Sequence, residues 1–259
     1  MLSFFSSEIK NFKNLVVKTD KNILIILISI PLITTISWYY TSRTFFKVNI
    51  YPYIVETVTN LELTEILYWL VSDSVTCLVF PCLILLLLRE KISGYGMNFS
   101  NWKTGWKYVL TALVFIIPVL WIISSFGAFI NYYPTVSESR DNLSVFLVYQ
   151  LGLIIYLFAW EFLWRGYLLF GLEKKFGFYS IFIQLIPFVL LHNGKPLLET
   201  VSAIAGGILL GYIALRTRSF IYGFLIHLML ISGIEIISLL RYQNNEYGIG
   251  FNAIINILL

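Results

Sequence analysis

The sequence predicts an all-α integral membrane protein, a bundle of about seven transmembrane helices with an eighth as the alternative. Hydrophobic residues make up 58% of the chain and charged residues 12%, too few charges for the mixed surface of a soluble domain. The 259 residues suffice for six to eight spans of roughly 20 residues with short loops. We therefore expect one membrane domain over residues 22–259.

The first 21 residues predict a basic amphipathic helix that lies on an anionic membrane surface. Phe5, Ile9, Phe12 and Val16 recur at helical spacing, and the segment carries four lysines, a pattern typical of interfacial helices. The alternative is a segment that binds a partner.

Seven apolar stretches follow, each near the length of the hydrocarbon core. They are residues 22–40, 66–88, 106–125, 145–170, 178–192, 199–215 and 219–240. The fifth is short. Residues 248–259 are too few to cross and would lie in the interface or re-enter the membrane.

The positions of lysine and arginine predict a cytoplasmic N-terminus, because loops that carry these residues tend to stay inside. With that orientation, twelve lie in inner segments and five in outer loops, and Arg165 lies within a span. The inner set is Lys10, Lys13, Lys18, Lys21, Arg89, Lys91, Lys103, Lys107, Lys174, Lys175, Arg216 and Arg218; the outer set is Arg43, Lys47, Arg140, Lys195 and Arg241. We expect seven crossings in the plasma membrane.

A stripe of small residues in the sixth span, Ala203, Gly207 and Gly211, predicts close helix packing. Small side chains let helix backbones approach where lipid provides no hydrophobic force between helices.

Ionisable residues inside the predicted spans indicate a polar site. Each costs roughly 2.5 kcal/mol or more at the bilayer centre, so such residues usually face a protein interior. They are Asp73, Glu161, Arg165, His192, Glu199, His227 and Glu235. Taken singly, each has a structural explanation. Glu161 and Arg165, for example, are four residues apart and could form a buried ion pair. Together, one glutamate and two histidines on three spans predict a shared polar pocket, whereas Asp73 and Glu235 are interpreted as packing or hydrogen-bonding residues.

Three short motifs follow one another in residues 145–240. Glu161 and Arg165 are spaced four apart, Phe188 and His192 are spaced four apart, and His227 follows on the last span. This order resembles the CAAX protease and bacteriocin-processing (CPBP, or Abi) family of intramembrane glutamic endopeptidases, related to the type 2 CAAX prenyl protease. Its signature is Glu-Glu-x-x-x-Arg, then Phe-x-x-x-His, then His-x-x-x-Asn or Asp.

Two positions depart from that signature. Trp160 stands where the first glutamate would be, which carries the catalytic role in the prenyl protease, and Ile231 stands where an asparagine or aspartate helps to hold the oxyanion. We expect Glu161 to take the catalytic role of the missing glutamate. The alternative is that the protein has lost catalytic activity.

The resemblance implies that Glu161 and His192 activate one water and that His227 donates to the oxyanion. Arg165 would either keep Glu161 ionised or seat a substrate carboxylate. Phe188 and Glu199 are supporting candidates, and Glu199 would fix the loop after His192, orient His192 or cap the sixth helix. No cofactor is implied. Zinc held by two histidines and a carboxylate is the competing chemistry.

The leading hypothesis is an intramembrane endopeptidase that cuts a membrane-associated protein or peptide, with lipids and that substrate as partners and no nucleic acid. A catalytically inactive relative that acts as a binding or immunity protein is the alternative, favoured by Trp160 and Ile231. A small-solute transporter is disfavoured because the sequence has no internal repeats.

Overall fold

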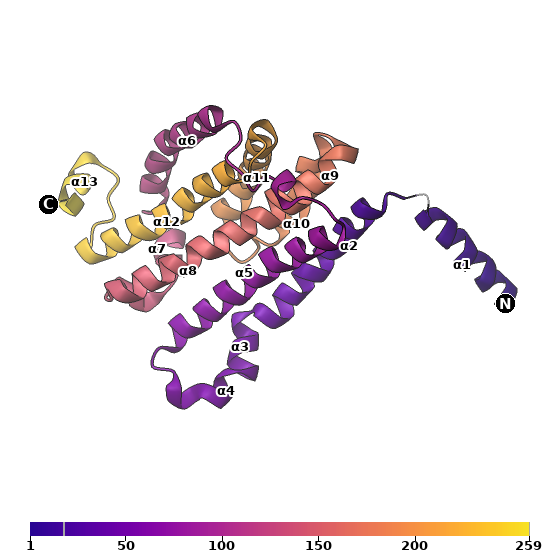
Figure 1. Ribbon diagram of the computed structural model, residues 1–259. Helices are drawn as coiled ribbons and strands as arrows, with labels where there is room; N and C mark the ends of the chain where they lie inside the picture. The colour runs from indigo at the N-terminus through magenta and orange to yellow at the C-terminus, as the bar shows by residue number, and fades with distance from the viewer. Residues whose placement is uncertain (18, 259) are drawn as a thin grey trace.

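The computed structural model describes residues 1–17 and 19–258 and has helices but no β-strands within those ranges (Figure 1). Lys18, one of the lysines assigned to the inner side, lies outside the described residues. The prediction of an all-α membrane bundle is confirmed.

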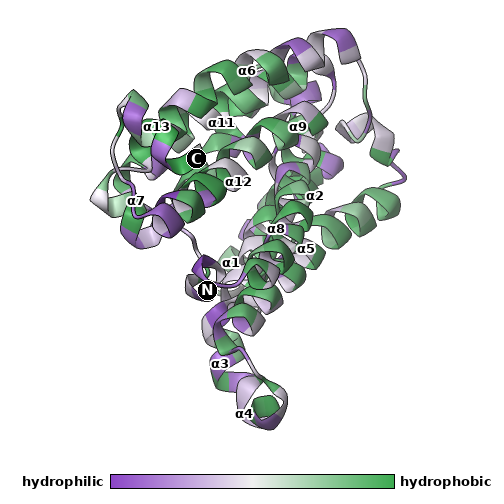
Figure 2. Ribbon diagram, turned by 90° about the vertical axis from the view of Figure 1, so that its left-hand side faces the viewer, coloured by the Kyte–Doolittle hydropathy of each residue, from purple (hydrophilic) through white to green (hydrophobic). Residues whose placement is uncertain are grey.

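Among the described residues, six helices are long and apolar enough to cross a membrane. Their hydrophobic residues cover most of their length (Figure 2), as expected where lipid is the solvent. They are α2 (Lys21–Ile36) with the π-helix η1 (Ser37–Thr41), α5 (Leu61–Leu87), α6 (Trp102–Ile123), α8 (Leu143–Glu161) with the π-helix η5 (Phe162–Leu168) and α9 (Leu169–Phe176), α11 (Leu197–Thr217), and α12 (Ile221–Asn244). The chain is a multi-pass membrane protein.

The predicted fifth span, residues 178–192, is wrong as a full-length crossing. The helix found there, α10 (Tyr179–Leu190), has 12 residues and is therefore about 18 Å long, against a core of about 30 Å. A hydrogen-bonded turn follows, in which Gly194 adopts φ +98°. Non-helical backbone at membrane depth is tolerated where protein or a cavity surrounds it, so this segment need not be a complete helix.

The remaining elements are short and connect or flank the long helices. They are α1 (Leu2–Val17), α3 (Arg43–Asn49), α4 (Tyr51–Ile54), η2 (Val55–Thr57), η3 (Ile92–Tyr95), α7 (Gly127–Tyr132), η4 (Ser137–Arg140) and α13 (Phe251–Leu258). The helix α1 projects away from the bundle (Figure 1). Its position on a membrane surface stays a prediction.

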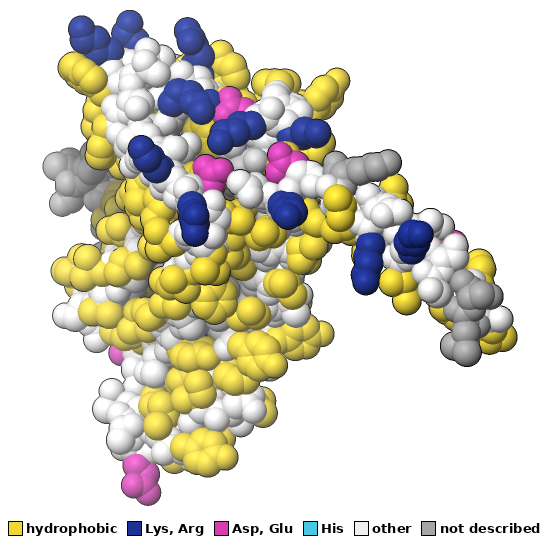
Figure 3. Space-filling model, turned by 45° about the vertical axis from the view of Figure 1, so that its right-hand side comes forward, with side chains coloured by type: hydrophobic (Ala, Val, Ile, Leu, Met, Phe, Trp, Pro, Cys, Tyr) yellow, Lys and Arg dark blue, Asp and Glu magenta, His cyan; other side chains and the backbone are white. Residues whose placement is uncertain are grey.

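The loops assigned to the inner side meet at one end of the bundle. There Arg218 Nη1 donates to Glu173 Oε1 at 2.6 Å and Asn22 Nδ2 to Glu90 Oε1 at 3.1 Å. Figure 3 shows Lys and Arg side chains gathered at one end, above a broad belt of hydrophobic side chains. The loops predicted to lie on the inner side therefore share one end of the bundle, while the side of the membrane on which this end lies stays a prediction.

The small-residue stripe of α11 packs against α10, as predicted. A methyl group built on Gly207 would lie 2.5 Å from Leu185 Cδ1, and one on Gly211 would lie 3.2 Å from Ile181 Cγ2. The two helices are thus closer than side chains at these positions would permit. This contact fixes the helix that leads into the turn holding His192.

Candidate functional site

A buried carboxylate joins two of the predicted motifs. Glu161 Oε1 accepts a hydrogen bond from Arg165 Nη1 at 2.9 Å and one from His227 Nδ1 at 2.7 Å. The side chains of Glu161 and Arg165 are both fully buried. The carboxylate thereby neutralises the guanidinium and fixes the orientation of the imidazole, as an acid commonly does for a catalytic histidine.

The helix changes its geometry directly after Glu161. Residues 162–168 form the π-helix η5, and single π-helical turns inside α-helices are frequently found at functional sites. This turn contains Arg165, whose guanidinium carbon lies 3.9 Å from the centre of the Phe188 ring. The predicted residue Phe188 thus supports the arginine through a cation–π contact.

His192 lies in the turn after α10, not in the helix itself. Its Nδ1 lies 2.8 Å from the carbonyl oxygen of Phe188. Because a carbonyl only accepts hydrogen bonds, Nδ1 carries the proton in this contact, and in the neutral ring Nε2 is left with its lone pair. The ring also packs on that of Phe188, with centroids 4.5 Å apart. The turn therefore presents His192 as a base in a fixed tautomer.

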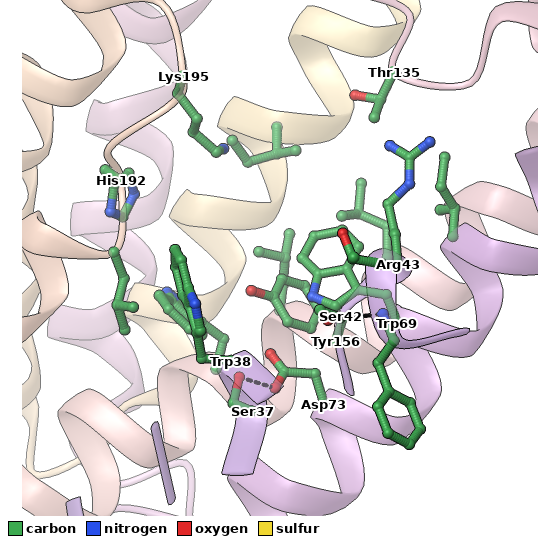
Figure 4. Close-up of a pocket in the computed structure, with 18 of the residues that line it drawn as sticks. Ser37, Trp38, Ser42, Arg43, Trp69, Asp73, Thr135, Tyr156, His192 and Lys195 are labelled. Carbon is green, nitrogen blue, oxygen red and sulfur yellow. Dashed lines mark hydrogen bonds between the residues drawn. The ribbon is translucent and has the colours of Figure 1, made fainter. Parts of the chain in front are cut away.

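Both histidines line one cavity of about 830 Å³, in which Figure 4 shows His192 on one wall. Trp160 and Ile231, the two positions that depart from the family signature, line the same cavity. Its wall does not include Glu161 or Arg165. The cavity thus brings the two imidazoles together, with Glu161 behind His227.

The second oxygen of Glu161, Oε2, is buried and has no hydrogen-bond partner among the described residues. A methyl group on Gly223 would come within 3.6 Å of it. The glycine therefore keeps the space beside this oxygen free of a side chain. Arg165, enclosed behind the cavity wall, is positioned to pair with Glu161 rather than to meet a substrate carboxylate.

Glu199 lies in the first turn of α11 and contacts Tyr133 and Lys195, not His192. It accepts a hydrogen bond from the Tyr133 hydroxyl at 2.7 Å and forms an ion pair with Lys195. Burial, and then the charge of Glu199, raise the pKa of the Tyr133 phenol well above its usual value, so this hydroxyl stays a donor. The acid therefore anchors the loop that follows His192, and the ring of His192 is oriented by Phe188 instead.

Sequence reasoning missed one acid of the cavity wall. Asp73, interpreted as a packing or hydrogen-bonding residue, does accept hydrogen bonds, but it also lines the cavity together with Trp69, one helical turn before it. Their spacing of four places them on one face of α5, a signal that the isolated acid did not reveal. Within the described part of the chain no group of three or more His, Cys, Asp or Glu side chains has the arrangement of a metal site.

The helices and the enclosed histidines define a class: a multi-pass membrane protein with a polar site inside its bundle. Residues 141–231 match the family model described as type II CAAX prenyl endopeptidase Rce1-like. This segment, which includes all three motifs from Glu161 to His227, is similar to the CAAX protease family. No curated protein matches it, and no solved structure does.

Proposed function

We propose that the protein is an intramembrane endopeptidase that hydrolyses a peptide bond of a membrane-associated protein or peptide. The observation that carries the proposal is the pair of imidazoles, held by Phe188 and Glu161, on the wall of one cavity. The similarity of residues 141–231 to the CAAX protease family agrees with this chemistry. Two imidazoles held in fixed orientations on the wall of one cavity suit proton transfer to and from a bound substrate.

In the proposed reaction, Nε2 of His192 removes a proton from a water molecule as the water oxygen attacks the carbonyl carbon. Nε2 of His227 donates a hydrogen bond to the oxyanion that forms. The bond from carbon to nitrogen then breaks, and the leaving amine takes the proton from His192. Each histidine has the tautomer or the charge partner that its step requires.

Glu161 has an indirect role in this proposal. The sequence favoured a water shared by Glu161 and His192, but the carboxylate is fully buried and binds His227 and Arg165. We assign it to orienting His227 and stabilising its protonated form, as the acid of a catalytic triad does for its histidine. Direct activation of the water by Oε2 would require this oxygen to reach the cavity.

The test is a comparison of membrane peptides from cells that contain the intact protein or its His192→Ala variant. The expected result is a peptide cleaved only with the intact protein, and the same cleavage after reconstitution of the purified protein in lipid. Equal cleavage by the intact protein and by the folded variant would refute the proposed role of His192. Cleavage by neither would refute the protease function.

A binding or immunity protein without catalysis is the second candidate, because Trp160 and Ile231 replace polar residues of the family signature on the cavity wall itself. The same experiment separates the two functions. Specific retention of a membrane peptide that is never cut, by the intact protein and by the His192→Ala variant alike, would favour the second.

For location and orientation, we propose a plasma-membrane protein with a cytoplasmic N-terminus. A reaction without a metal cofactor is a separate part of the proposal. The support for the orientation is the gathering at one end of the loops rich in lysine and arginine together with the positive-inside rule. A protease added outside spheroplasts should leave an N-terminal epitope tag intact and remove it only after lysis. Removal of the tag in intact spheroplasts would reverse the orientation.

A further inference from the structure

A second polar point of the cavity lies on α5, away from the two histidines. Asp73 is 2% exposed and lines the cavity. The hydroxyls of Ser37 and Thr41, both in the π-helix η1, donate to the same oxygen, Oδ1. No described residue donates to Oδ2. Figure 4 shows the Asp73 carboxylate beside Ser37 at the cavity.

The charges around the cavity leave this carboxylate without a counter-ion. Besides the two histidines, of which His227 faces Glu161, two cationic side chains among the described residues line the same cavity, and each is already paired: Arg43 with Glu65 and Lys195 with Glu199. Asp73 forms no ion pair within the described residues and is bound only by neutral hydroxyls. A buried carboxylate in a membrane protein is normally paired with a cation or neutralised by a proton.

Aromatic rings line the cavity next to this acid. Trp38 follows Ser37 directly in η1, Trp69 lies one turn before Asp73 on α5, and Tyr156 packs on Trp69 with ring centroids 4.9 Å apart. All three line the cavity, and Figure 4 labels them around the carboxylate. Aromatic faces with a carboxylate are the arrangement that proteins use to bind organic cations.

The depth of Asp73 indicates where such a cation comes from. Asp73 lies twelve residues after Leu61, the first residue of α5, about 18 Å along the helix and near the middle of a hydrocarbon core of about 30 Å. A lipid headgroup stays at the interface, whereas a peptide bound in the cavity brings its side chains to this depth.

We propose that Asp73, with Trp38, Trp69 and Tyr156, forms a subsite that binds a cationic side chain of the peptide held in the cavity. The inference rests on the proposed function for the peptide nature of the ligand and adds the residue class recognised. The carboxylate supplies the charge through Oδ2, and the rings cover the aliphatic part of the side chain and its cation. Peptides with lysine or arginine a few residues from the scissile bond are the preferred ligands.

Binding, rather than cleavage, tests this subsite. The probe is a leucine-rich peptide with blocked ends, a neutral fluorophore and a single central lysine, compared with the same peptide carrying acetyl-lysine. Fluorescence anisotropy with the purified protein in lipid nanodiscs should give a Kd about tenfold lower for the lysine peptide, a ratio typical of a charge-assisted contact in a desolvated site.

The Asp73→Asn variant should abolish this preference, since the amide oxygen still accepts from Ser37 and Thr41 while the charge is lost. Glu235→Gln is the matched control, an equally buried acid of which both oxygens already have donors, from Thr135 and Tyr149. It should retain the preference. Trp69→Leu, which keeps the carboxylate, should lower the preference several-fold and serves if the asparagine variant does not fold.

Equal affinity of the intact protein for the two peptides, binding of neither, or a preference that survives both Asp73→Asn and Trp69→Leu would overturn the subsite. The result is independent of catalysis. A lysine preference without any cleavage would support the subsite and count against the protease function. Cleavage without a lysine preference would support the protease function and overturn the subsite.

Discussion

Replacing Glu161 by glutamine tests whether the buried carboxylate holds the site together. The substitution keeps the size of the side chain but removes the charge that faces both Arg165 and His227. Arg165 is fully buried, and its Nε and Nη2 have no partner among the described residues. The loss of its one counter-charge within the described part of the chain should therefore cost about 3–5 kcal/mol of folding stability, the usual result of breaking a buried ion pair.

The double variant separates charge pairing from other effects of the glutamine. Replacing Arg165 by methionine in the Glu161→Gln background removes the unpaired charge and keeps an unbranched side chain against Phe188. We expect most of the lost stability to return, with a coupling energy of about 2 kcal/mol or more between the two positions.

The assay is reversible unfolding of the purified protein in mixed micelles with a rising fraction of dodecyl sulfate, followed by tryptophan fluorescence. The seven tryptophans include Trp160 and Trp164, each of which directly precedes one member of the ion pair in sequence. A glutamine variant within about 0.5 kcal/mol of the parent, the range of an ordinary surface substitution, would refute the role given to the carboxylate. Purely additive losses in the double variant would refute it as well.

Three further predictions concern catalysis and packing. His192→Ala or His227→Ala should each lower cleavage of a reconstituted peptide by about 100-fold or more, as measured by mass spectrometry; rates within twofold of the parent would contradict the assignment. Gly207→Leu should destabilise the protein by about 1–3 kcal/mol through overpacking against Leu185, whereas Gly206→Leu, which points into open space, should be nearly neutral; the dodecyl sulfate titration compares them. Chelation with EDTA should leave cleavage unchanged, and a loss that zinc restores would support the metal alternative.

The long helices were predictable because lipid imposes a simple rule on the sequence: a stretch of roughly 20 apolar residues crosses the core. The rule does not apply to α10, because its 12 residues, Tyr179–Leu190, are too few to cross the core and a turn follows them. The turn there is stabilised by local bonds such as Thr200 Oγ1 to the His192 carbonyl. These hydrogen bonds depend on how α11 packs against α10, which the hydropathy of the sequence does not reveal.

The site was predictable to the level of its motifs. Spacing alone placed Glu161 and Arg165 on one helical face, and the requirement that intramembrane histidines face protein predicted a shared pocket for His192 and His227. Which of two adjacent residues faces the cavity was beyond the sequence, because Trp160 and Glu161 point about 100° apart on a helix and only the neighbouring helices decide which is enclosed. Asp73 was missed for the same reason.

The π-helical turn after Glu161 has a consequence for how this protein tolerates change in length. A widened turn holds one residue more than the α-helical turn it replaces, so deleting a single residue from 162–168 would restore regular winding and leave the helix beyond it close to its present orientation. The guanidinium of Arg165 would lose its place above Phe188, whereas the packing of α9 on α10 would be retained. The same deletion in the regular part of α8 would rotate everything beyond it by about 100° around the axis and misalign the half of the bundle that carries His192.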